Sequence, residues 1–229
     1  MKDDEARDLW FSSYVRNWLD RDVADLARVG DAPELRRVLL ATAARTGGIL
    51  NQAEVARDAG VPRTTAHRYL ALFGLGRLID LLPAYGRNLS LRAIKAPRVF
   101  WRDAGLATHF VAGRGPERLR DHPAWGALLE NLVLCNLRAW ASARSGGAEL
   151  SYWRTAGGRE IDFVVEVEGR TVPIEVKATA RPGTSDCRHL AVFLEAAGRR
   201  APYGVLLHAG DTFETLLPGV VSVPIRAVL

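Results

Sequence analysis

The sequence predicts an α+β protein in two parts: a helical unit over residues 1–118 that contains a winged helix-turn-helix, and an α/β domain over residues 122–229. Three observations predict this division. Apolar residues recur at helical spacing through most of the first part, whereas apolar and polar residues alternate, as in strands, between 149 and 177. Between the two parts, residues 113–123 contain the glycines and prolines that are typical of a domain boundary.

The composition excludes several classes of protein. Of the 229 residues, 48% are hydrophobic and 25% are charged, which excludes a disordered chain, a collagen-like repeat and a small disulfide scaffold. The two cysteines, Cys135 and Cys187, form no CxxC pair, so we expect a protein of the reducing cytoplasm. We expect no signal peptide, because residues 1–20 are rich in charge, and no membrane span, because no run of about 18 apolar residues occurs.

The first part begins with two expected helices. Over residues 5–29, apolar side chains such as Trp10 and Trp18 recur every three or four positions. Pro33 then begins a second helix, which we expect to end near Ala44.

Residues 51–70 carry the pattern of a helix-turn-helix. Asn51 is suited to cap the first helix, because its side chain accepts hydrogen bonds from backbone N–H groups that have no partner inside the helix. Gly60 allows the positive φ angle that a tight turn needs. Pro62 is expected at the first position of the second helix.

Two short strands are expected after this motif, over residues 77–82 and 98–101. They flank the basic stretch 84–97, which gives the outline of a wing. A short helix is expected over residues 103–110.

Positive charge is concentrated in one segment of the chain. Residues 33–118 hold 14 basic and 6 acidic residues, whereas residues 1–32 hold 5 basic and 8 acidic ones and residues 119–229 hold 12 of each. Such a basic block predicts a surface that faces a polyanion, and DNA is the partner we expect for a helix-turn-helix.

In this interpretation the start of the second helix contacts base edges in the major groove, and the cations of the wing contact phosphates. The residues expected in these two roles are Arg63, Thr64, Thr65, His67, Arg68, Arg87, Arg92, Lys95 and Arg98. The alternative is a winged helix that serves only for packing or for contact with another protein.

The second part is expected to follow the order α-β-β-β-α-β-β. Its first helix, over residues 124–143, has leucines and valines on its buried side. The remaining elements are expected at residues 149–155, 160–167 and 171–177 (strands), 185–197 (helix), and 203–208 and 220–224 (strands).

The strands at 160–167 and 171–177 carry the residues with the clearest chemical pattern. Strand side chains alternate between two faces, so Asp162 is expected on one side and the core-facing residues on the other, namely Ile161, Phe163, Val165 and Val167. By the same alternation, Glu175 and Lys177 share the face opposite Val172, Ile174 and Val176.

If Glu168 and Gly169 form a two-residue hairpin loop, Asp162 lies opposite Glu175, and Glu160 lies opposite Lys177.

Two close carboxylates and an ammonium group suit a hard divalent cation and phosphate chemistry. In this hypothesis Asp162 and Glu175 bind Mg²⁺, and Lys177 stabilises the attacking water or the leaving oxygen. Glu130, in the middle of an otherwise apolar helical stretch, is a third carboxylate for the same catalytic and metal-binding role. The alternative is that these are ordinary polar residues on the solvated face of a hairpin.

The set Glu130, Asp162, Glu175 and Lys177 resembles the PD-(D/E)xK restriction-endonuclease-like superfamily. In that superfamily, a helix Glu, a strand Asp and a (D/E)xK strand bind Mg²⁺ and cut DNA. Nearly the whole chain resembles the C-terminal part of a prokaryotic AAA+ ATPase family, in which a P-loop ATPase precedes a winged helix and a nuclease-like, DUF4143-like domain of largely unknown role. The segments that carry this resemblance are residues 14–22, 51–70, 103–106, 126–131, 153–154, 158–163 and 174–177.

The chain departs from that family in two ways. It has no GxxxxGK[ST] motif, so we expect no ATPase of its own, and Pro62 stands where the family often has a serine cap. The resemblance implies a DNA-binding protein with a Mg²⁺-dependent nuclease-like site. The alternative is a non-catalytic adaptor that binds DNA or protein and acts with a separately encoded AAA+ ATPase. A transcriptional regulator is a third interpretation, although it leaves the second part unexplained.

Overall fold

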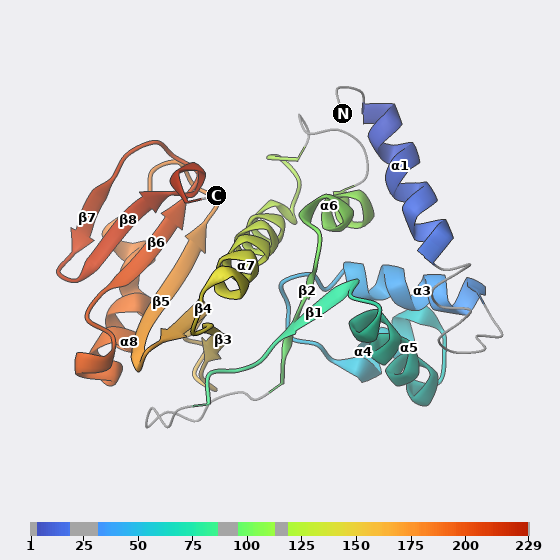
Figure 1. Ribbon diagram of the computed structural model, residues 1–229, viewed down its shortest axis with the longest axis horizontal. Coiled ribbons are helices and arrows are strands. Elements are labelled where there is room, and N and C mark those ends of the chain that lie inside the picture. The colour runs from blue at the N-terminus through green and yellow to red at the C-terminus, as the bar shows by residue number, and fades with distance from the viewer. Residues whose placement is uncertain (1–3, 19–31, 87–95, 113–118, 229) are drawn as a thin grey trace. The chain divides into compact units, whose positions relative to one another are not determined.

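The computed structural model describes residues 4–18, 32–86, 96–112 and 119–228 (Figure 1). The fold is mixed α+β, as the sequence predicts. The chain divides into two compact units, one of Met1–Leu81 with Val99–Asn131 and one of Leu82–Arg98 with Leu132–Leu229. This division differs from a single boundary near residue 120, because the chain enters the second unit once before the boundary and returns to the first.

The first unit is mainly helical. Its helices are α1 (Asp4–Asn17), α3 (Ala32–Ala43), α4 (Gln52–Ala59), α5 (Arg63–Leu75), α6 (Ala104–Ala112) and the beginning of α7 (Trp125–Ala143). The helix expected over 5–29 is present as α1, and residues 19–31 lie outside the described part of the chain. The apolar faces of α3 and α5 meet in one core, where Leu39 and Phe73 are fully buried.

Helices α4 and α5 form the predicted pair joined by a tight turn. Asn51 caps α4, because its Oδ1 accepts hydrogen bonds from the backbone N–H groups of Ala53 and Glu54 at 3.1 and 3.4 Å. Gly60 adopts a φ of +63°, the left-handed conformation in which a side chain would be strained. Pro62 caps α5 and stands one position before the helix, not at its first position as expected.

Strands β1 (Ile79–Leu82) and β2 (Arg98–Trp101) pair with each other, which confirms the two predicted strands. Asn131 of α7 binds the edge of β2 like a short strand: its Oδ1 accepts from the Trp101 backbone N–H at 2.7 Å, and its Nδ2 donates to the Trp101 carbonyl at 3.2 Å. This double contact explains why the fully buried amide of Asn131 is stable in a core.

The chain after β1 does not leave as a free loop. Pro83 and Tyr85 form backbone hydrogen bonds with Tyr152 of the second unit's sheet, and the Tyr85 ring is buried there at 5.7 Å from Phe193. The basic stretch that we expected to form the wing continues with Arg87, Arg92 and Lys95, which lie outside the described residues.

A mixed sheet of six strands forms the second unit, in the order β3-β4-β5-β6-β8-β7. The strands are β3 (Glu149–Arg154), β4 (Glu160–Val167), β5 (Arg170–Lys177), β6 (Gly204–His208), β7 (Glu214–Leu217) and β8 (Val220–Pro224). β5, β6 and β8 are parallel neighbours, whereas the pairs β3–β4, β4–β5 and β7–β8 are antiparallel. Five of these strands match their predicted positions, and β7 was not predicted.

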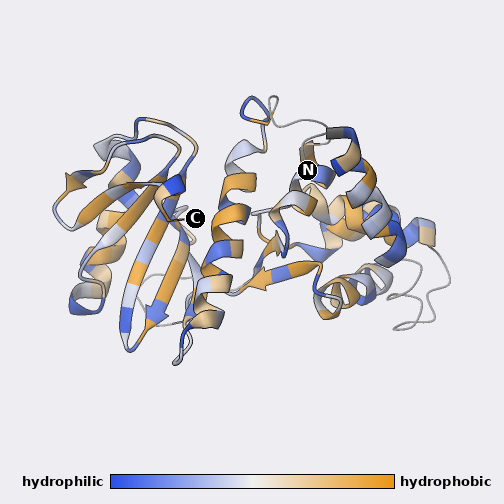
Figure 2. Cartoon of the chain, turned by 45° about the horizontal axis from the view of Figure 1, so that its top comes forward, coloured by the Kyte–Doolittle hydropathy of each residue, from blue (hydrophilic) through white to orange (hydrophobic). Residues whose placement is uncertain are grey.

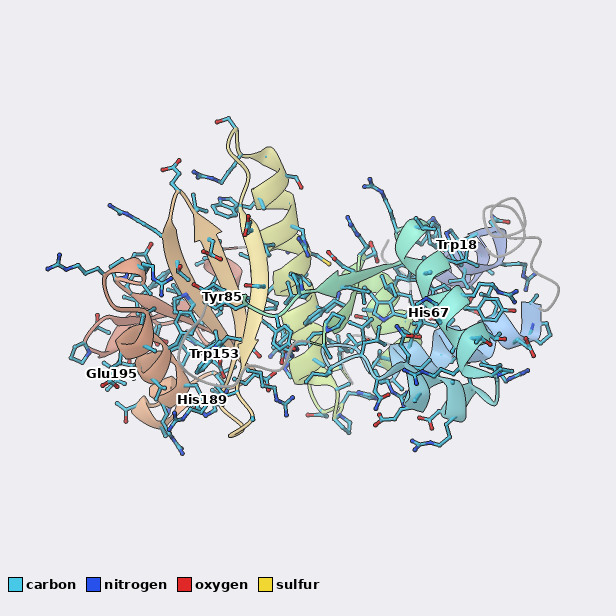
Figure 3. All side chains as sticks on the ribbon, turned by 90° about the horizontal axis from the view of Figure 1, so that it is seen from below. Trp18, His67, Tyr85, Trp153, His189 and Glu195 are labelled. Carbon is cyan, nitrogen blue, oxygen red and sulfur yellow. The ribbon has the colours of Figure 1, made fainter. Side chains whose placement is uncertain are left out.

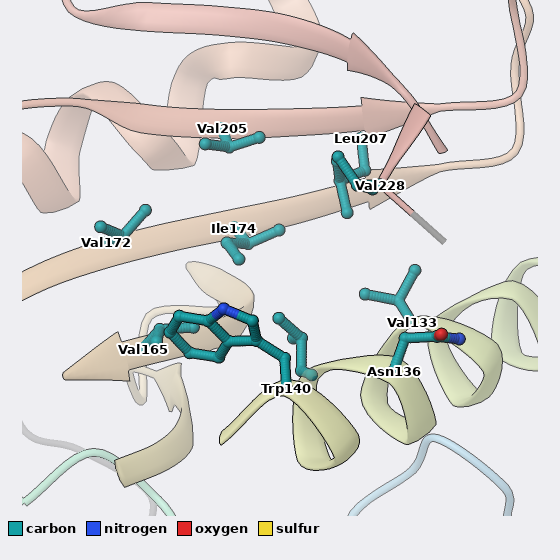
Figure 4. A pocket seen from close by; sticks show the side chains of 10 residues that line it. Val133, Asn136, Trp140, Val165, Val172, Ile174, Val205, Leu207 and Val228 are labelled. Carbon is teal, nitrogen blue, oxygen red and sulfur yellow. The ribbon is translucent and has the colours of Figure 1, made fainter. Parts of the chain in front are cut away.

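Each face of this sheet has its own helix. Helix α8 (Arg188–Ala197), which follows the short 3-10 helix Thr184–Cys187, buries Leu190 and Phe193 against one face. The end of α7 borders the other face around an apolar pocket of about 480 Å³ (Figure 4). The pocket's wall includes Trp140 of α7 and Ile174 and Leu207 of the sheet. Figure 2 shows the resulting hydrophobic character of the central strands.

The predicted alternation fails at one place in β4. The register between β3 and β4 shifts between Ser151 and Trp153, where β4 contains an extra residue. As a result Ile161 and Val164 pack in the same cluster as α8, whereas Val165 lines the pocket beside α7. The expectation that Ile161 and Val165 share one face was therefore wrong, because a bulge reverses the alternation.

Candidate functional site

The hairpin of β4 and β5 has the register that the sequence predicts. Glu168 and Gly169 form its turn with φ angles of 50° and 78°, as in the two-residue turns that favour a glycine. The paired residues run from Val167 opposite Arg170 to Phe163 opposite Ile174. The next residues along the two strands are Asp162 and Glu175.

Both oxygens of the Asp162 carboxylate have partners. Oδ2 accepts a hydrogen bond from the backbone N–H of Val176 at 2.9 Å, and Oδ1 accepts one from Arg98 Nη1 at 3.2 Å. The same guanidinium nitrogen lies 3.5 Å from Glu160 Oε1, and Arg154 pairs with the second oxygen of Glu160 at 3.5 Å.

Glu175 and Lys177 form an ion pair beside Asp162. Lys177 Nζ donates to Glu175 Oε1 at 2.8 Å. The other carboxylate oxygen, Glu175 Oε2, is buried and has no hydrogen-bond partner among the described residues. A buried carboxylate oxygen without a partner is costly, and an ion or a water molecule at this position would satisfy it.

The electrostatics of this group follow from its burial. Burial raises the pKa of Glu175 to about 8; the neighbouring Asp162 carboxylate adds to this effect, and Lys177 opposes it. For Lys177, burial lowers the pKa, but the carboxylates of Glu175 and Asp162 outweigh burial and leave it raised. Burial also raises the pKa of the Cys187 thiol, with a further contribution from Asp186 and Glu175.

Burial excludes the solvated-face alternative for the two carboxylates. Asp162 is 7% exposed and Glu175 is 6% exposed. We expected only the apolar face of this hairpin to be covered. Helix α8 packs against β4 and β5 on the face of Asp162 and Glu175, so that this face is covered as well. In Figure 3, Trp153 and His189 are labelled in this part of the second unit. His189 Nδ1 lies 3.1 Å from the Glu160 carbonyl.

The structure brings three of the four expected catalytic residues together: Asp162, Glu175 and Lys177 all belong to the second unit. Glu130 lies in the part of α7 that belongs to the first unit. Its side chain is half-buried and lies close to Gly47. A role for Glu130 beside the other carboxylates stays a prediction.

A polar hollow lies at the end of the sheet where Lys177 is found. Its volume is about 520 Å³, and it is lined by the loops that follow β5 and β6, including Arg181, Asp211 and Thr212. Because β5 and β6 are parallel, their carboxyl ends meet at this edge of the sheet. The two loops are joined by a hydrogen bond from the Ala209 N–H to the Thr179 carbonyl at 3.0 Å.

Sequence reasoning missed one residue of the site and misassigned its role. Arg98 was expected to contact phosphates, but its side chain is buried and pairs with Asp162 and Glu160. Arg98 and Asp162 are separated by 64 residues in the sequence, so only the fold reveals that they pair. A signal was present in the sequence, because Arg98 begins an otherwise apolar strand.

The residues expected to read DNA occupy the start of α5. Arg63, Thr64, His67 and Arg68 are exposed, and Thr65 is half-buried. The His67 ring, labelled in Figure 3, lies 3.0 Å from Gln52 Oε1 through its Nδ1. Arg68 stacks over the Tyr69 ring at 5.1 Å.

Within the described residues, no cluster of three or more His, Cys, Asp or Glu side chains is arranged to hold a metal ion. Asp162 and Glu175 are two neighbouring carboxylates of this site that could contact a cation. No helix of the described residues is long and apolar enough to cross a membrane.

Comparison with known proteins gives two family matches. Residues 1–117 match a domain of unknown function, DUF8612, and residues 125–228 match a domain of unknown function, DUF4143. The chain is 30% identical over 220 residues to the uncharacterized protein Rv2008c of Mycobacterium tuberculosis and to the uncharacterized protein Mb2031c of Mycobacterium bovis. These matches cover 96% of the chain and 48% of each relative, so the chain spans about half the length of these relatives. No solved structure matches the chain significantly.

Proposed function

The chain belongs to the family defined by the DUF8612 domain, and we propose that it binds DNA and hydrolyses phosphodiester bonds with Mg²⁺ at the site of Asp162, Glu175 and Lys177. In this proposal α4, α5 and the pair β1–β2 act as a winged helix, and the second unit is a PD-(D/E)xK restriction-endonuclease-like domain. The protein would act in the cytoplasm.

One observation carries the proposal: within the part of the chain that the structure describes, Glu175 Oε2 is buried without a hydrogen-bond partner, next to a second buried carboxylate, Asp162. Lys177 and Arg98 each offset part of the charge of one carboxylate, and a divalent cation in contact with both carboxylates would stabilise their charged forms further. Mg²⁺ suits this donor set, because it prefers oxygen ligands and is commonly held by one or two carboxylates while it keeps several waters.

The residues would divide the chemistry among them. When bound, Mg²⁺ would lower the pKa of a water molecule and stabilise negative charge on the phosphate. Asp162 and Glu175 would hold it, with Asp162 oriented by the Val176 N–H. The Lys177 ammonium would donate hydrogen bonds to the attacking water or the leaving oxygen. Glu130 is proposed as an assisting carboxylate.

The charges around the carboxylates also suit a polyanionic substrate. Arg98, Arg154 and Lys177 stand beside Glu160, Asp162 and Glu175, so that one bound divalent cation would leave the group with an excess of positive charge. A backbone phosphate is attracted by such an excess. Binding to the duplex itself would come from the exposed side chains at the start of α5 and would weaken as salt is added.

A second candidate function rests on Arg98. Because this guanidinium already neutralises Asp162, the site is also consistent with a non-catalytic adaptor that binds DNA or protein and acts with a separately encoded AAA+ ATPase. In that case the ion pairs would serve only to stabilise the sheet.

Cleavage assays distinguish the two candidates. The full chain is incubated with linear and branched DNA in Mg²⁺ or Mn²⁺, beside Asp162→Asn, Glu175→Gln and the control Glu195→Gln, an exposed carboxylate of α8 labelled in Figure 3. We expect cutting by the wild type and by Glu195→Gln, and a loss of at least about a hundredfold in the two site variants.

Two results would contradict the enzyme proposal. Undiminished cutting by Asp162→Asn and Glu175→Gln would assign the activity to another site or to a contaminant. DNA binding without any cutting in either metal would favour the adaptor.

A further inference from the structure

The Arg98 side chain occupies an unusual place for an arginine. It begins β2, it is 5% exposed, and its Nη1 reaches both Asp162 Oδ1 at 3.2 Å and Glu160 Oε1 at 3.5 Å. Its guanidinium carbon also lies 5.9 Å from the centre of the Tyr152 ring. A buried charge is retained in a protein only with close partners, and Asp162 lies nearer to Arg98 than Glu160 does.

Both carboxylate oxygens of Asp162 already accept a hydrogen bond, and this limits how a metal ion can bind there. One oxygen accepts the Val176 N–H, which the β4–β5 hairpin fixes in place. The other oxygen accepts a hydrogen bond from the Arg98 guanidinium, which can move because the arginine side chain has several rotatable bonds. Each oxygen keeps a second lone pair, so a cation at Asp162 would share Oδ2 with the Val176 N–H, or would share Oδ1 with Arg98 or displace it, and in each case it would lie close to the Arg98 guanidinium.

Arg98 cannot avoid this competition by losing its proton. The guanidinium group stays charged under all conditions in which the protein is folded. A divalent cation at Asp162 would meet a fixed positive charge a few ångströms away in a partly desolvated site, where like charges repel strongly.

From this geometry we infer that Arg98 is a resident cation of the Asp162 carboxylate that competes with the divalent metal and sets how tightly the metal binds. The inference rests on the proposed function of the site and adds its regulation. Arg98 stabilises the charged form of Asp162 while no metal is bound, and it withdraws from Asp162 when the metal binds.

Arg154 provides a matched control. It is a second arginine of the same cluster and pairs with Glu160 at 3.5 Å, but it has no contact with Asp162 among the hydrogen bonds and ion pairs of the described residues. If the general positive charge of the cluster governed metal affinity, Arg154 and Arg98 would matter equally. If contact with Asp162 governs it, only Arg98 matters.

The experiment measures Mn²⁺ affinity by electron paramagnetic resonance of the free ion, with the wild type, Arg98→Gln, Arg98→Lys and Arg154→Gln. We expect Arg98→Gln to tighten Mn²⁺ binding by about tenfold or more, and Arg154→Gln to change it by less than about threefold. Arg98→Lys keeps the charge and is expected to stay near the wild type. Binding by Arg98→Gln where the wild type shows none supports the inference as well.

A second measurement needs no variant and so does not depend on whether Arg98→Gln folds. In wild-type protein with ¹⁵N-labelled arginine, the Arg98 guanidinium signals are expected to lose their protection from solvent exchange as Mg²⁺ is added. Unchanged Arg98 signals at saturating Mg²⁺ would overturn the inference, as would equal or weaker Mn²⁺ binding by a folded Arg98→Gln.

The outcomes separate this inference from the proposed function. If the wild type binds Mn²⁺ and Arg98→Gln binds it no better, the competition fails and the metal site stands. If neither the wild type nor any of the variants binds Mn²⁺, the metal site and the competition both fail.

Discussion

The cations at the start of α5 and the cations around Asp162 differ in their contact with water. Arg63 and Arg68 are exposed, whereas Arg98 is 5% exposed and pairs with Asp162 and Glu160. An exposed arginine contributes little to stability and is free to bind phosphates, whose attraction salt then screens. A buried one is fixed in place, so its removal leaves an unpaired carboxylate in the core. Similar side chains are thus exposed to solvent in one unit and fixed among carboxylates in the other.

The largest effect, on the rate of DNA cleavage, is expected from Lys177→Met at the site of Asp162, Glu175 and Lys177. Loss of the ammonium removes stabilisation of charge in the transition state, so cleavage should fall by about a hundredfold to a thousandfold. The Mn²⁺ affinity should not fall, since Lys177 is not a proposed ligand and its ammonium beside Glu175 repels the cation. Cleavage rates and Mn²⁺ titration of the same preparation check this. A variant that cuts as fast as the wild type would remove Lys177 from the proposed mechanism.

The next effect is a pH dependence of stability that the exposed cations should not show. In the folded metal-free protein the pKa of Glu175 is about 8, above its ordinary value of 4.5, because burial and Asp162 disfavour the charged form. The folded state therefore holds the proton more tightly than the unfolded chain. This stabilisation is fully present below about pH 4.5 and is lost as the pH rises through about 8.

Denaturant unfolding in a chelator measures this effect. The free energy of unfolding should fall by up to a few kcal/mol between about pH 5 and about pH 8. In Glu175→Gln, which cannot ionise, this part of the decline should vanish. An equal slope in both proteins would show that Glu175 titrates normally in the folded state.

The smallest effect on stability is expected from the exposed arginines at the start of α5. The double substitution Arg63→Ala with Arg68→Ala should weaken binding to duplex DNA by about tenfold and lower its salt dependence, because two phosphate or base contacts are lost. The free energy of unfolding should change by less than about 1 kcal/mol. Fluorescence anisotropy over a range of salt concentrations, together with denaturant unfolding, tests both statements. Unchanged DNA affinity would favour a role for α5 in packing or protein contact.

Local signals in the sequence were enough to predict much of this structure. Asn51 and Gly60 determine the turn between α4 and α5 by their own hydrogen bonds and backbone angles, so they could be recognised without the rest of the chain. Glu168 and Gly169 likewise determine the register that places Asp162 near Glu175.

The features that escaped prediction depend on contacts distant in the sequence. The bulge that turns Ile161 toward α8 arises from pairing with β3, and no residue pattern in β4 marks it. The four-residue edge strand β7 is too short to show alternation. The pairing of Arg98 with Asp162 and the burial of Glu175 under α8 required the complete second unit.

The most direct test of the metal site is to locate Mn²⁺ by anomalous scattering in crystals of the full chain. The account predicts a peak in contact with one carboxylate oxygen of Asp162 and with Glu175 Oε2, at metal–oxygen distances of about 2.1 Å. A peak elsewhere, or none at these two carboxylates in crystals soaked with saturating Mn²⁺, would contradict it.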